Sequence, residues 1–159
     1  MVQFALRAPF PKGGAMLDLQ SCALAFPDRP DWVWLRWYWG ITDLLRAGVT
    51  LDDVAARERG RIACLATPYS DFPSGPVLAA DYAAEWAGLL SGAGLLPLSP
   101  ALSAFETGAA SAEIDPVSRV AEIVVVPPIE GWRQSAEVWR SVCTGLGAMR
   151  PVYLLNGGA

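Results

Sequence analysis

The sequence predicts an α/β fold built on an open parallel sheet with helices on both faces. Short, continuous apolar runs, such as residues 121–126, are typical of strands that are buried on both faces. Segments with helical spacing of apolar residues lie between these runs, and strands that alternate with helices form parallel sheets with right-handed crossovers. Hydrophobic residues make up 53% of the 159 residues, so one domain with a buried core is expected.

The stretch at residues 119–155 contains a complete unit of this kind. It reads as a buried strand, a polar loop, a helix and a second buried strand. In a parallel sheet such a unit places its loop at the carboxyl ends of the strands, where ligands bind. We therefore expect residues 127–141 to form one wall of any functional site.

Composition excludes several function classes. Twelve basic residues against 16 acidic ones give a net charge of -4, which argues against a nucleic-acid partner but leaves a small nucleotide open. The chain has no histidine, which removes Ser-His-Asp chemistry and most zinc sites. Cys22, Cys64 and Cys143 show no metal-ligand spacing, so they are interpreted as reduced thiols of a cytoplasmic protein. No metal, cofactor, signal peptide or membrane span is expected.

A tryptophan-rich helix is predicted after an irregular segment at residues 1–30. Asp31 is placed to cap it, and Trp32, Leu35 and Trp39 share one helical face. The aromatic residues fit a belt at a membrane surface, a stacking platform for bases, or a helix buried on more than one side in a subunit interface. We favour the buried helix because no lysine lies nearby.

Further helical structure is predicted up to Gly60. Residues 41–48 are expected to continue or follow the first helix, and Thr50 with Asp53 predicts a capped helix after them. Two short helices invite a helix-turn-helix interpretation, but the acidic residues of the second helix favour a helical cap on the main domain instead. The predicted domains are therefore a Trp-rich helical extension at residues 1–59 and an α/β domain at residues 60–159.

The α/β domain is expected to begin with a strand at residues 61–67, followed by a loop and a helix that runs from about Pro76 to Ser91. A strand at residues 95–99 is placed at the sheet edge because it contains Pro97. Residues 100–118 fit either a lid or a short helix, and the choice stays open. Strands at residues 121–126 and 151–155, with a helix near residues 135–146 between them, complete the sheet.

Six short motifs, in this order, resemble nucleoside 2-deoxyribosyltransferase-like proteins, in particular a phage and bacterial branch of mostly unknown function. The motifs are Ala66-Thr-Pro-Tyr-Ser, Ala93-Gly94, Leu98-Ser-Pro, Ala121-Glu-Ile-Val-Val-Val, Gly131-Trp-Arg-Gln-Ser and Arg150-Pro-Val-Tyr. The resemblance covers residues 61–155. It implies a flavodoxin-like Rossmann-type fold, a nucleoside or nucleotide at the strand ends, and a homodimer, because relatives often complete their pockets across subunits.

The resemblance also implies a catalytic carboxylate. Family members cleave the N-glycosidic bond with a glutamate on the helix after the Gly-Trp-type loop, and this glutamate attacks the anomeric carbon to form a glycosyl-enzyme. The equivalent position here is Ser141. Glu137 lies one helical turn earlier on the same face and is our candidate catalytic residue. The alternative is that Glu137 only interacts with the helix dipole.

The candidate substrate-binding residues lie in the same loops. Tyr69 and Asp71 follow the strand at residues 61–67, and Asp115 precedes the strand at residues 121–126. Trp132 offers a ring that can stack on a base. The set is completed by Ser135 and Ser141.

Two functions from different classes follow. The first is N-glycosidic bond cleavage or deoxyribosyl transfer through Glu137. The second is a catalytically silent nucleotide-binding or assembly module that has lost the family glutamate at Ser141. A third interpretation makes the Trp-rich segment a partner-binding surface.

Overall fold

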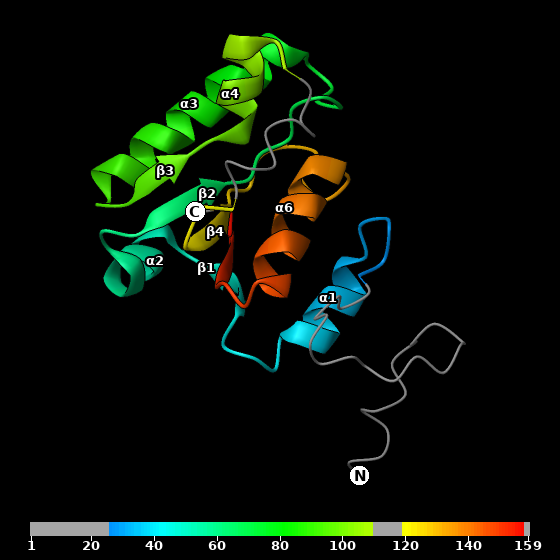
Figure 1. The fold of residues 1–159 in the computed structure, drawn as a ribbon, viewed down its shortest axis with the longest axis vertical. Coiled ribbons are helices and arrows are strands. Elements are labelled where there is room, and N and C mark those ends of the chain that lie inside the picture. Colours follow the sequence, from blue (N-terminus) through cyan, green and yellow to red (C-terminus); the bar gives the residue numbers. More distant parts are fainter. Residues whose placement is uncertain (1–25, 110–118, 158–159) are drawn as a thin grey trace.

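A computed structural model describes residues 26–109 and 119–157 of the chain. Within these residues, five strands form one parallel sheet in the order β1-β5-β4-β2-β3 (Figure 1), which confirms the predicted fold class. The strands are β1 (Leu45–Val49), β2 (Ile62–Leu65), β3 (Leu96–Leu98), β4 (Ile123–Val126) and β5 (Val152–Leu155). The helices are α1 (Trp32–Trp39), α2 (Leu51–Glu58), α3 (Pro76–Gly92), α4 (Pro100–Thr107) and α6 (Ala136–Gly147). Predictions made for residues 1–25 and 110–118 lie outside the described range.

The strand order is flavodoxin-like, except that the strand at one edge of the sheet comes from earlier in the chain. Reading from the other edge, β3-β2-β4-β5 gives the usual flavodoxin sequence, and the position beyond β5 is filled by β1, the first strand among the described residues. The connections that leave β2 and β4 run in opposite directions along the sheet. The crevice between β2 and β4 is therefore the topological switch point, where α/β proteins of this type bind ligands.

Strand β1 corrects the prediction of a helix at residues 41–48. Leu45 is buried and pairs with Val152, and the Val152 amide donates to the Leu44 carbonyl at 2.6 Å. Residues 45–49 form a strand instead of a helix because the open edge of β5 offers hydrogen-bond partners to their backbone, whereas an isolated short helix is only marginally stable. A strand between α1 and α2 also makes the helix-turn-helix interpretation wrong. Part of the segment before Gly60 thus belongs to the sheet.

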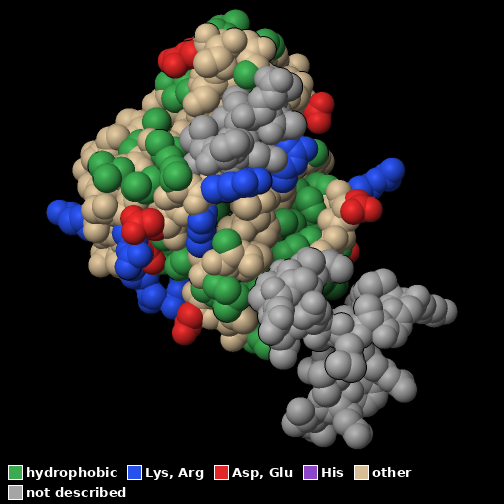
Figure 2. All heavy atoms as spheres, in the orientation of Figure 1, with side chains coloured by type: hydrophobic (Ala, Val, Ile, Leu, Met, Phe, Trp, Pro, Cys, Tyr) green, Lys and Arg blue, Asp and Glu red, His purple; other side chains and the backbone are tan. Residues whose placement is uncertain are grey.

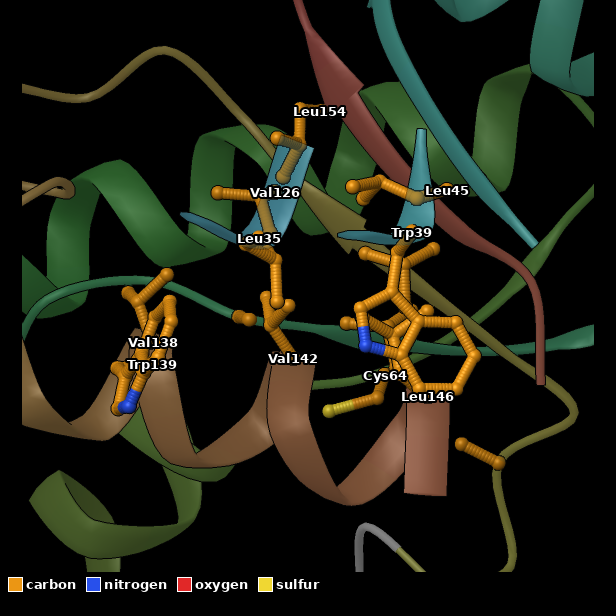
Figure 3. Close-up of a cluster of buried hydrophobic side chains, with 14 residues drawn as sticks. Leu35, Trp39, Leu45, Cys64, Val126, Val138, Trp139, Val142, Leu146 and Leu154 are labelled. Carbon is orange, nitrogen blue, oxygen red and sulfur yellow. The ribbon is translucent and has the colours of Figure 1, made fainter. Parts of the chain in front are cut away.

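Helices cover both faces of the sheet (Figure 1). Because side chains alternate along a strand, Val124 and Val126 of β4 join the core on the α1 and α6 side, while Ile123 and Val125 join the core with α2 and α3. Figure 3 shows the first of these cores, in which α6 and α1 side chains meet those of the strands. The buried residues that α1 and α6 contribute to it are Leu35, Trp39, Val138, Trp139, Val142 and Leu146.

Helix α1 is buried on one side and exposed on the other. The Asp31 carboxylate accepts the Trp34 amide at 2.9 Å, which confirms the predicted cap. Trp39 is 4% exposed, but Trp37 is 51% and Val33 83% exposed. Within residues 26–109 and 119–157, α1 is therefore buried on one side, and burial of its other side in a subunit interface stays a prediction.

Other local predictions are confirmed by hydrogen bonds and position. Thr50 and Asp53 form the reciprocal bonds of a capping box at the start of α2. Strand β3, with Pro97, lies at the edge of the sheet. Of the two alternatives for residues 100–118, a short helix, α4, forms at residues 100–107, with Ser99 as its cap. Each helix within residues 26–109 and 119–157 is too short or too polar to span a bilayer.

Gly145 provides a test of how tightly α6 packs on the sheet. A Cβ atom at this position lies 2.7 Å from Cγ2 of Val124 and 3.3 Å from Cγ2 of Val152, both stiff side chains of buried strands. We expect Gly145→Ala to lower the free energy of unfolding by about 1–2 kcal/mol, because overpacking outweighs the gain in helix propensity. Gly88→Ala in α3, where the added methyl meets open space, should raise it by up to about 1 kcal/mol. Urea unfolding of both variants measures the two changes in the free energy of unfolding. Changes of the same sign contradict the packing described for Gly145.

Tyr153 provides a test at high pH. Its hydroxyl donates to the Glu58 carboxylate at 2.5 Å, and burial, with the hydrogen bond and charge of Glu58, raises the pKa of Tyr153 to about 12. The unfolded chain titrates near pH 10. Since the folded-state pKa is the higher one, the stabilisation is complete below about pH 10 and is lost as the pH rises toward about 12.

We expect the free energy of unfolding of Tyr153→Phe, measured with urea at pH 7, to be about 1 kcal/mol lower than that of wild type. The difference should shrink between about pH 10 and 12, where wild type loses its contribution. Tyr82→Phe, at a partly exposed position on α3, is the matched control and should show no such trend. A wild-type advantage that is constant with pH contradicts the prediction.

Candidate functional site

The loops that follow β2 and β4 meet at the same rim of the sheet. Strands β2 and β4 pair in parallel, with Cys64 beside Val124 and Leu65 beside Val125. The contact continues past β2, where the Ala66 amide donates to the Val125 carbonyl at 3.0 Å. The loop after Thr67 and the loop after Val126 therefore lie side by side, and Phe72 of the first packs in one apolar cluster with Ile129 of the second.

Glu137 joins these two loops directly. Its Oε2 accepts the Tyr69 amide at 2.8 Å and the Ser70 amide at 3.1 Å, and its Oε1 accepts the Ser70 amide at 3.3 Å and the Ser70 hydroxyl. Both oxygens of the carboxylate therefore bind the β2–α3 loop. Hydrogen bonds to a charged group contribute about 1.5–3 kcal/mol each in favourable geometry, so this contact is a strong anchor for the loop.

Local structure at the start of α6 aims Glu137 at this loop. The Ser135 hydroxyl accepts the Val138 amide at 3.3 Å, so Ser135 is the N-cap and Glu137 lies in the first turn, where a carboxylate is favoured by the helix dipole. Ser135 is 4% exposed and occupied as a cap, so its hydroxyl acts on the helix.

A small hollow lies beside Glu137 at the switch point. Its volume is about 20 Å³, which is room for one or two water molecules. Helix α4 closes it from one side. The lining residues are Ala66, Thr67, Tyr69, Pro100, Ala101, Ala104, Glu137 and Ser141.

The structure brings together three of the seven predicted site residues, namely Tyr69, Glu137 and Ser141, which line this hollow. Asp71 is exposed and lies outside the lining, and Trp132 packs instead against Trp32, with 4.7 Å between ring centroids. Ser135 is the N-cap described above, and Asp115 lies outside the described residues.

Sequence analysis did not select Thr67, which also lines the hollow. Thr67 is 5% exposed, and its hydroxyl is buried without a hydrogen-bond partner in the described part of the chain. A buried hydroxyl without a partner costs about 1–3 kcal/mol, so the Thr67 hydroxyl is an unsatisfied polar group in a wall that Glu137 and Ser141 also line. The residues beside Thr67 in the sequence, Ala66 and Pro68, do not indicate that its hydroxyl is buried without a partner.

The two described cysteine thiols are buried or half-buried. Burial raises the pKa of the Cys143 thiol to about 12, so it stays protonated, and Cys64 is buried in the core. No group of three or more Cys, Asp or Glu side chains with metal-binding geometry occurs within residues 26–109 and 119–157.

Charged side chains are distributed unevenly over the surface. On the face shown in Figure 2, arginine side chains gather in a band across the middle, while Asp and Glu lie mostly singly toward the margins. Some of this charge has structural partners: Arg61 lies 3.4 Å from Glu58 and 3.7 Å from Glu122. The net charge of -4 thus does not prevent locally positive regions.

Comparison with protein-family models, with curated proteins and with solved structures gives no significant match for this chain. The resemblance to nucleoside 2-deoxyribosyltransferase-like proteins therefore depends on motif order and spacing. What the structure establishes is the α/β fold with its parallel sheet.

The contact between Glu137 and the β2–α3 loop can be tested by substitution. We expect Glu137→Gln to lower the free energy of unfolding by about 2 kcal/mol, because an amide has one acceptor oxygen where the carboxylate offers two. The amides of Tyr69 and Ser70 should exchange hydrogen faster, while the sheet amides keep their protection. Glu130→Gln, at an exposed position before Gly131, is the matched control and should change neither quantity. Unaltered exchange at Tyr69 and Ser70 in Glu137→Gln contradicts the anchor role.

Proposed function

We propose that this chain is a catalytically silent nucleoside- or nucleotide-binding module on a nucleoside deoxyribosyltransferase-like fold. The proposal depends on the hydrogen bonds that the Glu137 carboxylate accepts. A glycosyl transfer needs a carboxylate oxygen that is free to approach an anomeric carbon at about 3–3.5 Å. Both oxygens of Glu137 instead accept hydrogen bonds from the β2–α3 loop.

The size and chemistry of the hollow support the same proposal. Pockets that enclose small ligands have volumes of about 300–1,000 Å³, whereas the hollow beside Glu137 measures about 20 Å³. Ser141 stands at the position of the family glutamate, and the chain has no histidine to activate a hydroxyl. A substrate cannot be enclosed there without movement of the loop or of α4.

A second candidate is N-glycosidic bond cleavage or deoxyribosyl transfer through Glu137. It is favoured by the shared position of Tyr69, Glu137 and Ser141 at the rim where α/β proteins bind ligands. For this candidate the loop at Tyr69 must release the carboxylate when a substrate enters.

Product analysis separates the two candidates. Wild-type protein is incubated with a panel of nucleosides and 5′-mononucleotides, with and without an acceptor base, and free base is measured by chromatography. We expect no base release from wild type, and release at a measurable rate only from Ser141→Glu, which restores the family carboxylate. The outcome that supports the second candidate is release by wild type that disappears in Glu137→Gln. Calorimetry on the same panel measures binding, and absence of any binding contradicts the proposed function.

A further inference from the structure

A second and much larger hollow lies at the carboxyl ends of β1, β5 and β4, beside α1. Its volume is about 610 Å³, within the range of about 300–1,000 Å³ typical of pockets for small ligands. It is termed the Trp/Arg groove here, after its most distinctive lining residues, Trp32, Arg36, Trp132 and Arg133. Its remaining walls come from the end of β5 and from the bulged edge of β1.

The groove is positively charged in a protein that is negatively charged overall. Arg36 and Arg133 are both exposed, and no Asp or Glu is among the lining residues. In the described parts of the chain, neither guanidinium lies within ion-pair distance of a carboxylate. Two arginines without a carboxylate partner give a local attraction for anions, and their planar donors suit phosphate or carboxylate groups.

The aromatic side chains of the groove are fixed before any ligand arrives. The Trp32 Nε1–H donates to the Arg133 carbonyl oxygen at 2.7 Å. The Trp32 ring also contacts Trp132 edge-on at 4.7 Å and Trp139 edge-on at 5.1 Å between centroids. Rings that are held in place cost little entropy when a ligand packs on them, and half-buried indoles offer apolar surface to a flat ring.

Backbone at the ends of β1 and β5 forms one side of the groove. A bulge shifts the register of β1 between Ala47 and Val49, and Gly48 adopts a φ of +70°, which glycine accommodates without strain. The Asn156 amide group closes this edge: its Nδ2 donates to the Gly48 carbonyl at 3.3 Å and its backbone N–H to the Val49 carbonyl at 3.0 Å. The end of β5 is thereby fixed against the end of β1.

We propose that the Trp/Arg groove binds a small anion that carries a flat aromatic ring. Arg36 and Arg133 hold the anionic group, and the indoles of Trp32 and Trp132 pack against the ring. The 5′-mononucleotides belong to this class, so the inference rests on the proposed function where it names a nucleotide. It places that function in the Trp/Arg groove instead of the hollow beside Glu137.

Calorimetry on the full chain tests the groove with four probes: 5′-AMP, adenosine, phenyl phosphate and inorganic phosphate. We expect the two aromatic phosphates to bind at least about tenfold more tightly than adenosine or inorganic phosphate, because only they engage both guanidinium and indole groups. Raising the salt concentration should weaken their binding.

Substitutions at the rim identify the residues. Arg36→Gln and Arg133→Gln should each weaken binding of phenyl phosphate at least about tenfold, and Val33→Glu, which adds a negative charge at an 83% exposed lining position, should do the same. The controls are Arg57→Gln on α2 and Val77→Glu on α3, both exposed and outside the groove, which should bind as wild type does. Thermal unfolding of each variant shows that a loss of binding is not a loss of fold.

The outcomes separate this inference from the proposed function. If 5′-AMP binds wild type and binding survives all three rim substitutions, the groove is overturned and the nucleotide-binding function stands. If phenyl phosphate binds through the arginines but no nucleoside or nucleotide binds, the groove stands and the nucleotide function is overturned. If none of the probes binds, both are overturned.

Discussion

Parallel pairing of β2 with β4 is the constraint on which the candidate site depends. Because the two strands are neighbours, the loop after Thr67 lies against the start of α6, although about 70 residues separate them in the chain. Glu137 uses this proximity to bind the amides of Tyr69 and Ser70. The hollow at this crevice is bounded by Glu137 and Tyr69 and, from another side, by α4, so only a small volume of about 20 Å³ stays open.

Sequence reasoning predicted the elements that have strong local signals. The strands from β2 to β5, the capping box of Thr50 and Asp53, and the edge position of Pro97 follow from composition and spacing, and each is present in the structure. Strand β1 was missed because its apolar pattern is weak and its partner, β5, lies more than 100 residues away. A strand whose stability comes from a distant edge leaves little trace in its own residues.

The candidate site was predictable only in part. Ser141 was selected because the resemblance places a glutamate there, Glu137 because it lies one helical turn earlier, and Tyr69 because it follows a predicted strand. All three line the hollow. That both carboxylate oxygens accept hydrogen bonds from the loop was not predictable, because backbone amides of a loop carry no residue-specific signal. The pairing of Trp32 with Trp132 was missed likewise, since it joins residues 100 positions apart through a fold-dependent contact.

The origin of the groove residues bears on what distinguishes this chain from the family that it resembles. Trp32, Arg36 and Gly48 come from the segment before Gly60, which lies outside the resemblance, whereas Trp132, Arg133 and Leu155 come from within it. The groove exists only because β1 fills the sheet edge beyond β5 and brings α1 with it. If both proposals hold, Glu137 at the switch point holds the β2–α3 loop, and the ligand binds in the Trp/Arg groove farther along the same rim of the sheet. Such a division requires no catalytic residue to be retained, and it gives the Trp-rich segment a direct part in recognition.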